Sequence, residues 1–260
     1  MGVLTVDLTG FGVVMSADSD PIQALDGTTR ILVDPKRNHT RNPILKREAG
    51  GFAGYVGYVG TEEIEGRTTR DWLETFGRRH ATETLAEYAA ALGGDLTDVW
   101  QRTGLTSVLE ILIAGYDNGD VCFWFVRNSN GLNDGDGTYR APKAVFDAAN
   151  DLDDNIVRQS GEAKEDYLRT HLLSFRQGAL YPASRIFDLF RDILGELFAA
   201  QIPGFAPVAS VDDLRPFARQ RLEFIKRLYD MKHGIYRAPV APIGGKVHVV
   251  GVAPDTVLRD

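Results

Sequence analysis

The first sixty residues constrain the fold of this chain more than any other stretch. Two runs rich in β-branched and apolar residues, Val3 to Leu8 and Phe11 to Ala17, flank a Thr9-Gly10 turn, which predicts an antiparallel hairpin. Asp18 follows the second run directly, and a glycine-rich segment, Ala49 to Gly54, lies further along. This opening predicts a β-sheet at the start of the chain.

The rest of the sequence alternates between blocks of strand pattern and blocks of helix pattern. In chain order the pattern predicts strands at 30–33 and 44–46 around a polar loop, helices capped by Thr61 and Thr82, a hairpin at 107–116 and 121–127, a short strand at 156–158, helical stretches at 167–175, 186–197 and 217–229, and a last strand at 246–252. Helices grouped between mostly antiparallel strands indicate an α+β fold in layers, not βαβ winding.

Composition excludes several classes of function. The chain has 260 residues, 43% of them hydrophobic, which suits one large domain, and its formal net charge of -7 without a Lys/Arg cluster argues against nucleic acid or an anionic membrane as partner. The five histidines are dispersed and the single cysteine, Cys122, lies in an apolar run, so we expect no metal site, no cofactor and no reactive thiol. No apolar stretch is long enough for a spanning helix, which leaves the cytoplasm as the expected location.

Taken in order, these features resemble proteasome β-type subunits of the N-terminal-nucleophile hydrolase superfamily. The segments that carry the resemblance are 12–19, ending in the aspartate and serine, Gly51-Phe52-Ala53-Gly54, Ile113-Ala114-Gly115-Tyr116-Asp117 with 121–126, and Pro242-Ile243-Gly244-Gly245-Lys246-Val247. Bacterial proteasome-like peptidases and the ancestral β-subunit branch are the most similar groups. The resemblance implies a four-layer αββα sandwich, a single domain over 1–260 with an irregular insertion around 128–155, and a homo-oligomer, with a ring as one form.

The resemblance also implies where chemistry would lie. In that superfamily a threonine, serine or cysteine at the free N-terminus is the nucleophile, and its own α-amine accepts the proton. By position, Asp18 matches the family's aspartate, Arg30 its lysine, Gly51 or the neighbouring Gly50 its oxyanion glycine, and Ser160 a serine that follows the second hairpin. Arginine stays protonated, so Arg30 can hold Asp18 but cannot exchange a proton as a lysine might.

The nucleophile itself is missing from the written start of the chain. The family's first residue falls on Gly2 or Met1, and Thr5 becomes N-terminal only if the chain is cut just before it. The family's Asp/Ser pair before the last strand falls on Val240 and Ile243. Two functions remain: a non-catalytic structural or binding subunit, or a threonine-type amide-bond hydrolase that acts on a polypeptide after processing to Thr5 or from another start.

Each of these site residues also has a purely structural interpretation. Asp18 can accept hydrogen bonds from backbone N–H groups of the next turn, with Arg30 as its ion-pair partner, and Ser160 can cap a turn. The glycines at 51, 54, 57 and 60 can allow close packing with a neighbouring segment or subunit, with no oxyanion hole among them.

Overall fold

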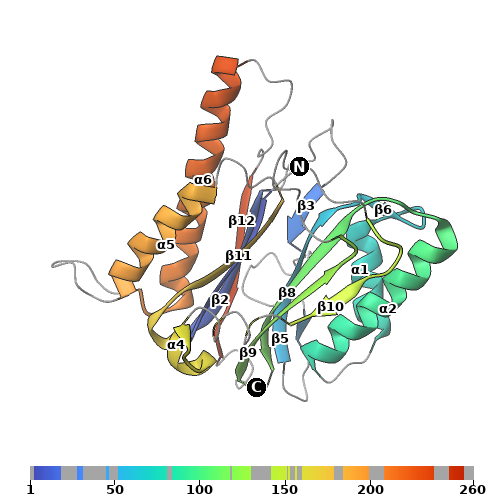
Figure 1. Cartoon of the computed structure of the whole chain (residues 1–260), viewed down its shortest axis with the longest axis horizontal. Coiled ribbons are helices and arrows are strands. Elements are labelled where there is room, and N and C mark those ends of the chain that lie inside the picture. Colours follow the sequence, from blue (N-terminus) through green and yellow to red (C-terminus); the bar gives the residue numbers. More distant parts are fainter. Residues whose placement is uncertain are drawn as a thin grey trace.

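A computed structural model of the chain describes residues 3–18, 28–31, 45–46, 52–80, 84–117, 119–129, 142–150, 152, 156, 160–178, 184–198, 208–236 and 246–254. Over these ranges the fold is α+β, with two larger antiparallel sheets and helices on their outer faces (Figure 1). The predicted fold class is confirmed at this level, and every strand pair described is antiparallel.

The first sheet is built around the predicted N-terminal hairpin. Its strand order is β11 (Leu173–Gly178), β1 (Val3–Thr9), β2 (Gly12–Asp18) and β12 (Val247–Val252). Across the hairpin turn, the Thr9 hydroxyl donates a hydrogen bond of 2.8 Å to the Gly12 carbonyl. The predicted final strand therefore lies beside the first hairpin, and β1 is a central strand with a neighbour on each edge.

Strand β11 corrects the sequence prediction. The stretch 167–175 was predicted as helical, yet helix α4 (Lys164–Thr170) ends at Thr170 and β11 begins at Leu173. Leu172 precedes the strand and packs in the cluster beneath α5 and α6, whereas Leu173 and Phe175 of the strand pack between the two sheets. Leu168, Leu172 and Phe175 are spaced by four and three residues, so together they imitate helical spacing although the first lies in α4 and the last in β11.

The second sheet has the order β10 (Asp147–Ala149), β9 (Asp120–Arg127), β8 (Leu109–Asp117), β5 (Phe52–Gly60) and β3 (Thr28–Ile31), with β4 (Leu45–Lys46) also paired to β5. The predicted β8–β9 hairpin is confirmed. β3 and β4 match predicted strands, but they pair with β5. β5 itself occupies the glycine segment expected before the first helix, and β10 lies within the expected irregular insertion.

Glycines in β5 and β8 bring backbones and side chains unusually close. A Cβ atom on Gly57 would lie 2.7 Å from Leu4 Cδ1 and 2.9 Å from Met15 Sδ in the opposite sheet. A Cβ on Gly115 would lie 2.5 Å from the Cα of Gly54, its partner across the β5–β8 pair. These glycines therefore serve close packing between strands and between sheets.

The helices begin later than predicted. Helix α1 (Thr69–Arg79) is capped by Thr68 and α2 (Leu85–Thr103) by Thr84, each hydroxyl accepting an N–H of the first turn at 3.1 Å. Thr61 is thus not the cap of α1, and its hydroxyl instead donates to the Val108 carbonyl at 2.9 Å, while Thr82, predicted as the second cap, lies outside the described residues. The segment before α1 is occupied by a small hairpin, β6 (Glu63–Ile64) with β7 (Arg67–Thr68).

Helices α5 (Ser184–Phe198) and α6 (Val211–Tyr236) follow the predicted stretches. The predicted strand at 156–158 is wrong at Ile156, which is helical. Among the described residues, no helix combines the length and apolar character needed to cross a membrane.

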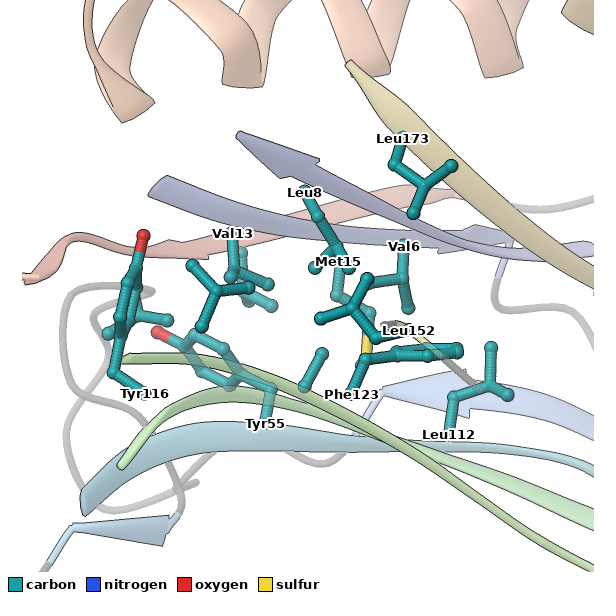
Figure 2. Close-up of a cluster of buried hydrophobic side chains, with 14 of the residues drawn as sticks. Val6, Leu8, Val13, Met15, Tyr55, Leu112, Tyr116, Phe123, Leu152 and Leu173 are labelled. Carbon is teal, nitrogen blue, oxygen red and sulfur yellow. The ribbon is translucent and has the colours of Figure 1, made fainter. Parts of the chain in front are cut away.

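Three apolar clusters connect these layers. The first lies between the two sheets, where Val6 and Met15 meet Tyr55 and Phe123, with Leu152 filling the space between them (Figure 2). The second joins the other face of the β8–β5 sheet to α1 and α2, and the third joins the other face of the β1–β2 sheet to α5 and α6. Because both faces of the β1–β2 sheet are covered, its polar side chains are buried and need partners.

Candidate functional site

The start of β1 and the end of β2 meet at Asp18. The Asp18 carboxylate is buried and accepts a hydrogen bond of 2.6 Å from the Val3 backbone N–H, while its backbone lies in register with Val247 of β12. The carboxylate therefore ties the first residue of β1 to the last residue of β2. This is a backbone contact of the kind expected from the structural interpretation, although the N–H comes from the strand that precedes Asp18.

Thr5 lies in the middle of β1, with Ser16 opposite it on β2 and Arg176 opposite it on β11. Its hydroxyl is 2.6 Å from Ser16 Oγ and accepts a hydrogen bond of 3.0 Å from Arg221 Nη2. The side chain is 1% exposed and faces α6, because Leu4 and Val6 on either side of it face the opposite sheet. Neither hydrogen-bond partner is a base that could take the hydroxyl proton.

The same face of β1 holds a buried ion pair that the sequence analysis missed. Arg221 of α6 donates from Nη1 to Asp7 Oδ1 at 2.9 Å and from Nη2 to Asp7 Oδ2 at 2.7 Å. The Ser174 hydroxyl of β11 donates to the same Asp7 oxygen as Arg221 Nη1, and the Arg221 guanidinium lies 5.0 Å from the Phe187 ring centre. Asp7 and Arg221 are both fully buried, so together they fix α6 against the sheet.

Two sequence signals could have revealed this pair. Asp7 is the one charged residue in a strand of apolar residues and threonines, and Arg221 falls on the apolar stripe of its helix, within one turn of Ala218, Leu222 and Ile225. A charge on an apolar stripe implies a buried partner of opposite sign.

Of the remaining predicted site residues, the structure describes the backbone of Arg30 and the side chain of Ser160. Arg30 lies on β3, in register with Tyr58, and β3 is adjacent to β1 and β2, but the Arg30 side chain lies outside the described residues. Gly50 and Gly51 also lie outside them. Ser160 is exposed; its hydroxyl donates to the Ile156 carbonyl at 2.9 Å and accepts from the Glu162 N–H at 3.1 Å, which is the turn-capping geometry.

The thiol of the single cysteine, Cys122, is unreactive. Burial, reinforced by the neighbouring Asp117 carboxylate, raises the pKa of the Cys122 thiol to about 12, and the thiol donates to Asp117 Oδ2 at 3.6 Å. A thiol with this pKa is almost entirely protonated at neutral pH and is a poor nucleophile. In the described part of the chain, no group of three or more metal-ligating side chains gathers.

A pocket of about 370 Å³ lies at the opposite end of β1 from Asp18. The β1–β2 turn contributes Gly10 and Phe11, the β8–β9 hairpin contributes Tyr116 and Val121, and α4 contributes Leu168. Charged residues at this pocket are Asp120, Lys164, Glu165 and Arg169. The charges are balanced, and the candidate site residues do not line it.

No protein-family profile and no curated protein matches this chain. Among solved structures it is similar to Anbu (ancestral beta-subunit) from Yersinia bercovieri, with 12% sequence identity and a TM-score of 0.46. The match covers 96% of this chain and 80% of that chain.

Proposed function

We propose that this chain is a proteasome-like subunit without catalytic activity, with a structural or binding role in a homo-oligomer. The fold we infer is the four-layer αββα sandwich of N-terminal-nucleophile type. The main support for this proposal is the environment of Thr5. The residue is 1% exposed, and its hydroxyl forms hydrogen bonds with Ser16 and with the guanidinium of Arg221. A residue held in this way is a structural member of the sheet.

The alternative, a hydrolase processed to expose Thr5, conflicts with this setting in three ways. Cutting before Thr5 would remove Leu4 from the core between the sheets, and Val3, whose N–H binds Asp18. The Thr5 hydroxyl faces α6, where the Arg221 guanidinium already occupies the space a substrate carbonyl would need. The guanidinium also donates to the Thr5 hydroxyl oxygen, whose lone pair would have to attack that carbonyl while the freed α-amine takes the proton.

We expect the mature chain to retain the residues before Thr5 and to show no turnover on fluorogenic peptides. The measurement is the intact mass and N-terminal sequence after prolonged incubation, followed by a peptide-hydrolysis assay of the same sample. Asp18→Asn keeps an acceptor oxygen for the Val3 N–H, so it should lower the free energy of unfolding by only about 1 kcal/mol. Asp120→Asn, at the exposed β8–β9 turn, is the matched control. A chain that begins at Thr5, with turnover that Asp18→Asn abolishes, would establish the hydrolase instead.

The outer face of α5 and α6 supports the homo-oligomer. Leu189 and Ile193 on α5 and Phe224 and Met231 on α6 are 40% to 61% exposed, although all four are large apolar side chains. The Phe190 ring, 5.8 Å from that of Phe224, connects the two halves of this apolar stripe. Apolar side chains gathered on two neighbouring helices are typical of an interaction surface, and we propose that a second copy of this chain covers it.

Leu189→Glu combined with Phe224→Glu should therefore shift the protein to a smaller assembly. Burying two carboxylates in an apolar contact is strongly unfavourable, so size-exclusion chromatography with light scattering should report a lower mass at equal concentration. Val145→Glu changes a side chain that is 46% exposed on a different part of the surface, and it should leave the mass unchanged. An unchanged mass for the double variant would place the contact elsewhere.

A further inference from the structure

A buried carboxyl group, Glu110, lies near the start of β8 and takes no part in the proposed function. Its side chain is 0% exposed, and strand alternation points it to the same side as Leu112 and Ala114, between the two sheets. Oε1 accepts a hydrogen bond of 3.0 Å from the Ser129 hydroxyl. Oε2 is buried and has no hydrogen-bond partner among the described residues. A buried acceptor without a hydrogen-bond donor is unfavourable, and more so when the acceptor is charged.

A cation lies within reach but does not contact the carboxylate. Arg127 is directly opposite Glu110 in the β8–β9 pair. Its Cζ instead lies over the Phe125 ring, 5.0 Å from the ring centre, on the same strand. Residues directly opposite in an antiparallel pair have Cβ atoms about 4.5–5.5 Å apart. Rotation about the Arg127 side-chain bonds alone can therefore bring the guanidinium from the ring to the free oxygen of Glu110.

The other described neighbours of Glu110 bring no compensating charge. On its other edge, β8 pairs with β5, and Val59 stands opposite Glu110. Across the gap between the sheets, the neighbouring strands present Leu4, Val6, Met15 and Ala17. The carboxylates of β1 and β2, Asp7 and Asp18, lie on the face that α6 covers. Arg127 is accordingly the cation that acts on Glu110.

We propose that Glu110 and Arg127 form a proton-linked switch at this end of the two sheets. In the protonated state Arg127 lies on the Phe125 ring, as in this structure. When Glu110 releases its proton to solvent, Arg127 turns to the carboxylate and becomes the missing partner of Oε2. Burial raises the pKa of Glu110 to about 6, against smaller lowering effects of the Ser129 hydrogen bond and the Arg127 charge, so the change falls near physiological pH.

The switch predicts that Glu110 and the Phe125 ring titrate together. NMR of protein with labelled glutamate carboxyls and phenylalanine rings, followed from about pH 4 to about pH 8, covers the range in which a buried carboxyl titrates. In the wild type, the Phe125 ring signals should shift with the same midpoint as the Glu110 carboxyl. In Arg127→Gln the Phe125 shift should vanish, and the Glu110 midpoint should rise by about one pH unit or more, because an opposite charge at contact distance is lost.

Arg102→Gln, which removes an exposed arginine paired with Glu65, is the matched control and should leave both titrations unchanged. A Phe125 ring that does not titrate in the wild type, or an unchanged Glu110 midpoint in Arg127→Gln, would overturn the switch.

The pH dependence of stability, compared between the wild type and Glu110→Gln, is a second test of the switch. The pKa of Glu110 in the folded protein lies above its usual value of 4.5, so its stabilising contribution is complete below pH 4.5 and is lost as pH rises through about 6. The denaturant midpoint of the wild type should therefore fall relative to that of Glu110→Gln over this interval. Parallel profiles would also overturn the switch. If Glu110→Gln does not fold, the NMR titration of Arg127→Gln alone decides whether the switch exists.

Discussion

Replacing Arg221 by methionine is expected to lower the free energy of unfolding by about 3–5 kcal/mol, because the Asp7 carboxylate is left buried without its counter-charge. Methionine keeps an unbranched apolar stem, so the loss reports mainly the missing guanidinium, including its contact with the Phe187 ring. Thr5 and Ser174 each lose a hydrogen-bond partner as well. Equilibrium unfolding in urea, followed by tryptophan fluorescence, measures the difference.

Arg219→Met is the matched control on the same helix. The Arg219 side chain is half-buried and donates to the Val247 carbonyl at 3.0 Å, so its loss should lower the free energy of unfolding by about 1 kcal/mol. Asp7→Val combined with Arg221→Met should recover most of the lost stability, since replacing both members of a buried ion pair is far less unfavourable than removing one. If Arg221→Met and Arg219→Met unfold at the same urea concentration, Arg221 does not fix α6 to the sheet.

The elements that the sequence predicted correctly carry their signals locally. The β1–β2 hairpin has a turn between two apolar runs, and α5 and α6 repeat apolar residues at helical spacing over several turns. In contrast, β5 contains Gly54, Gly57 and Gly60, which have low strand propensity in isolation. It forms a strand because β3, β4 and β8 pair with its edges. Position 57 is a glycine because the opposite sheet leaves little room for a side chain there.

The position of Asp18 in the fold was predictable from the sequence, but its contacts and those of Thr5 were not. Asp18 was placed correctly at the end of the second strand, yet its partner is the Val3 N–H. Asp7 and Arg221 come from opposite ends of the chain, and local patterns do not specify pairing over such a separation. Thr5 was considered only as a nucleophile, because its contact with Arg221 depends on how α6 packs over the sheet.

Gly115→Ala is expected to lower the free energy of unfolding by about 3 kcal/mol or more, because the added methyl group meets backbone that cannot rearrange as a side chain can. Its Cβ would overlap the Ala53 carbonyl oxygen and lie 2.5 Å from Gly54 Cα, so β5 and β8 would have to separate. In Gly57→Ala the methyl group meets the flexible ends of Leu4 and Met15, and the loss should be smaller, about 1–2 kcal/mol.

Gly94→Ala is the control of opposite sign. Gly94 is exposed in α2, and a Cβ there would have nothing within 4 Å, so alanine should stabilise the protein by about 0.5–1 kcal/mol through helix propensity. Urea unfolding of the three variants should therefore rank Gly94→Ala highest and Gly115→Ala lowest. Gly57 is the member of this set that belongs to the glycine segment, so the loss in Gly57→Ala tests the packing interpretation of that segment at this position. A Gly57→Ala variant as stable as Gly94→Ala would remove the packing explanation for Gly57, and a Gly115→Ala variant as stable as Gly94→Ala would remove it for the β5–β8 contact.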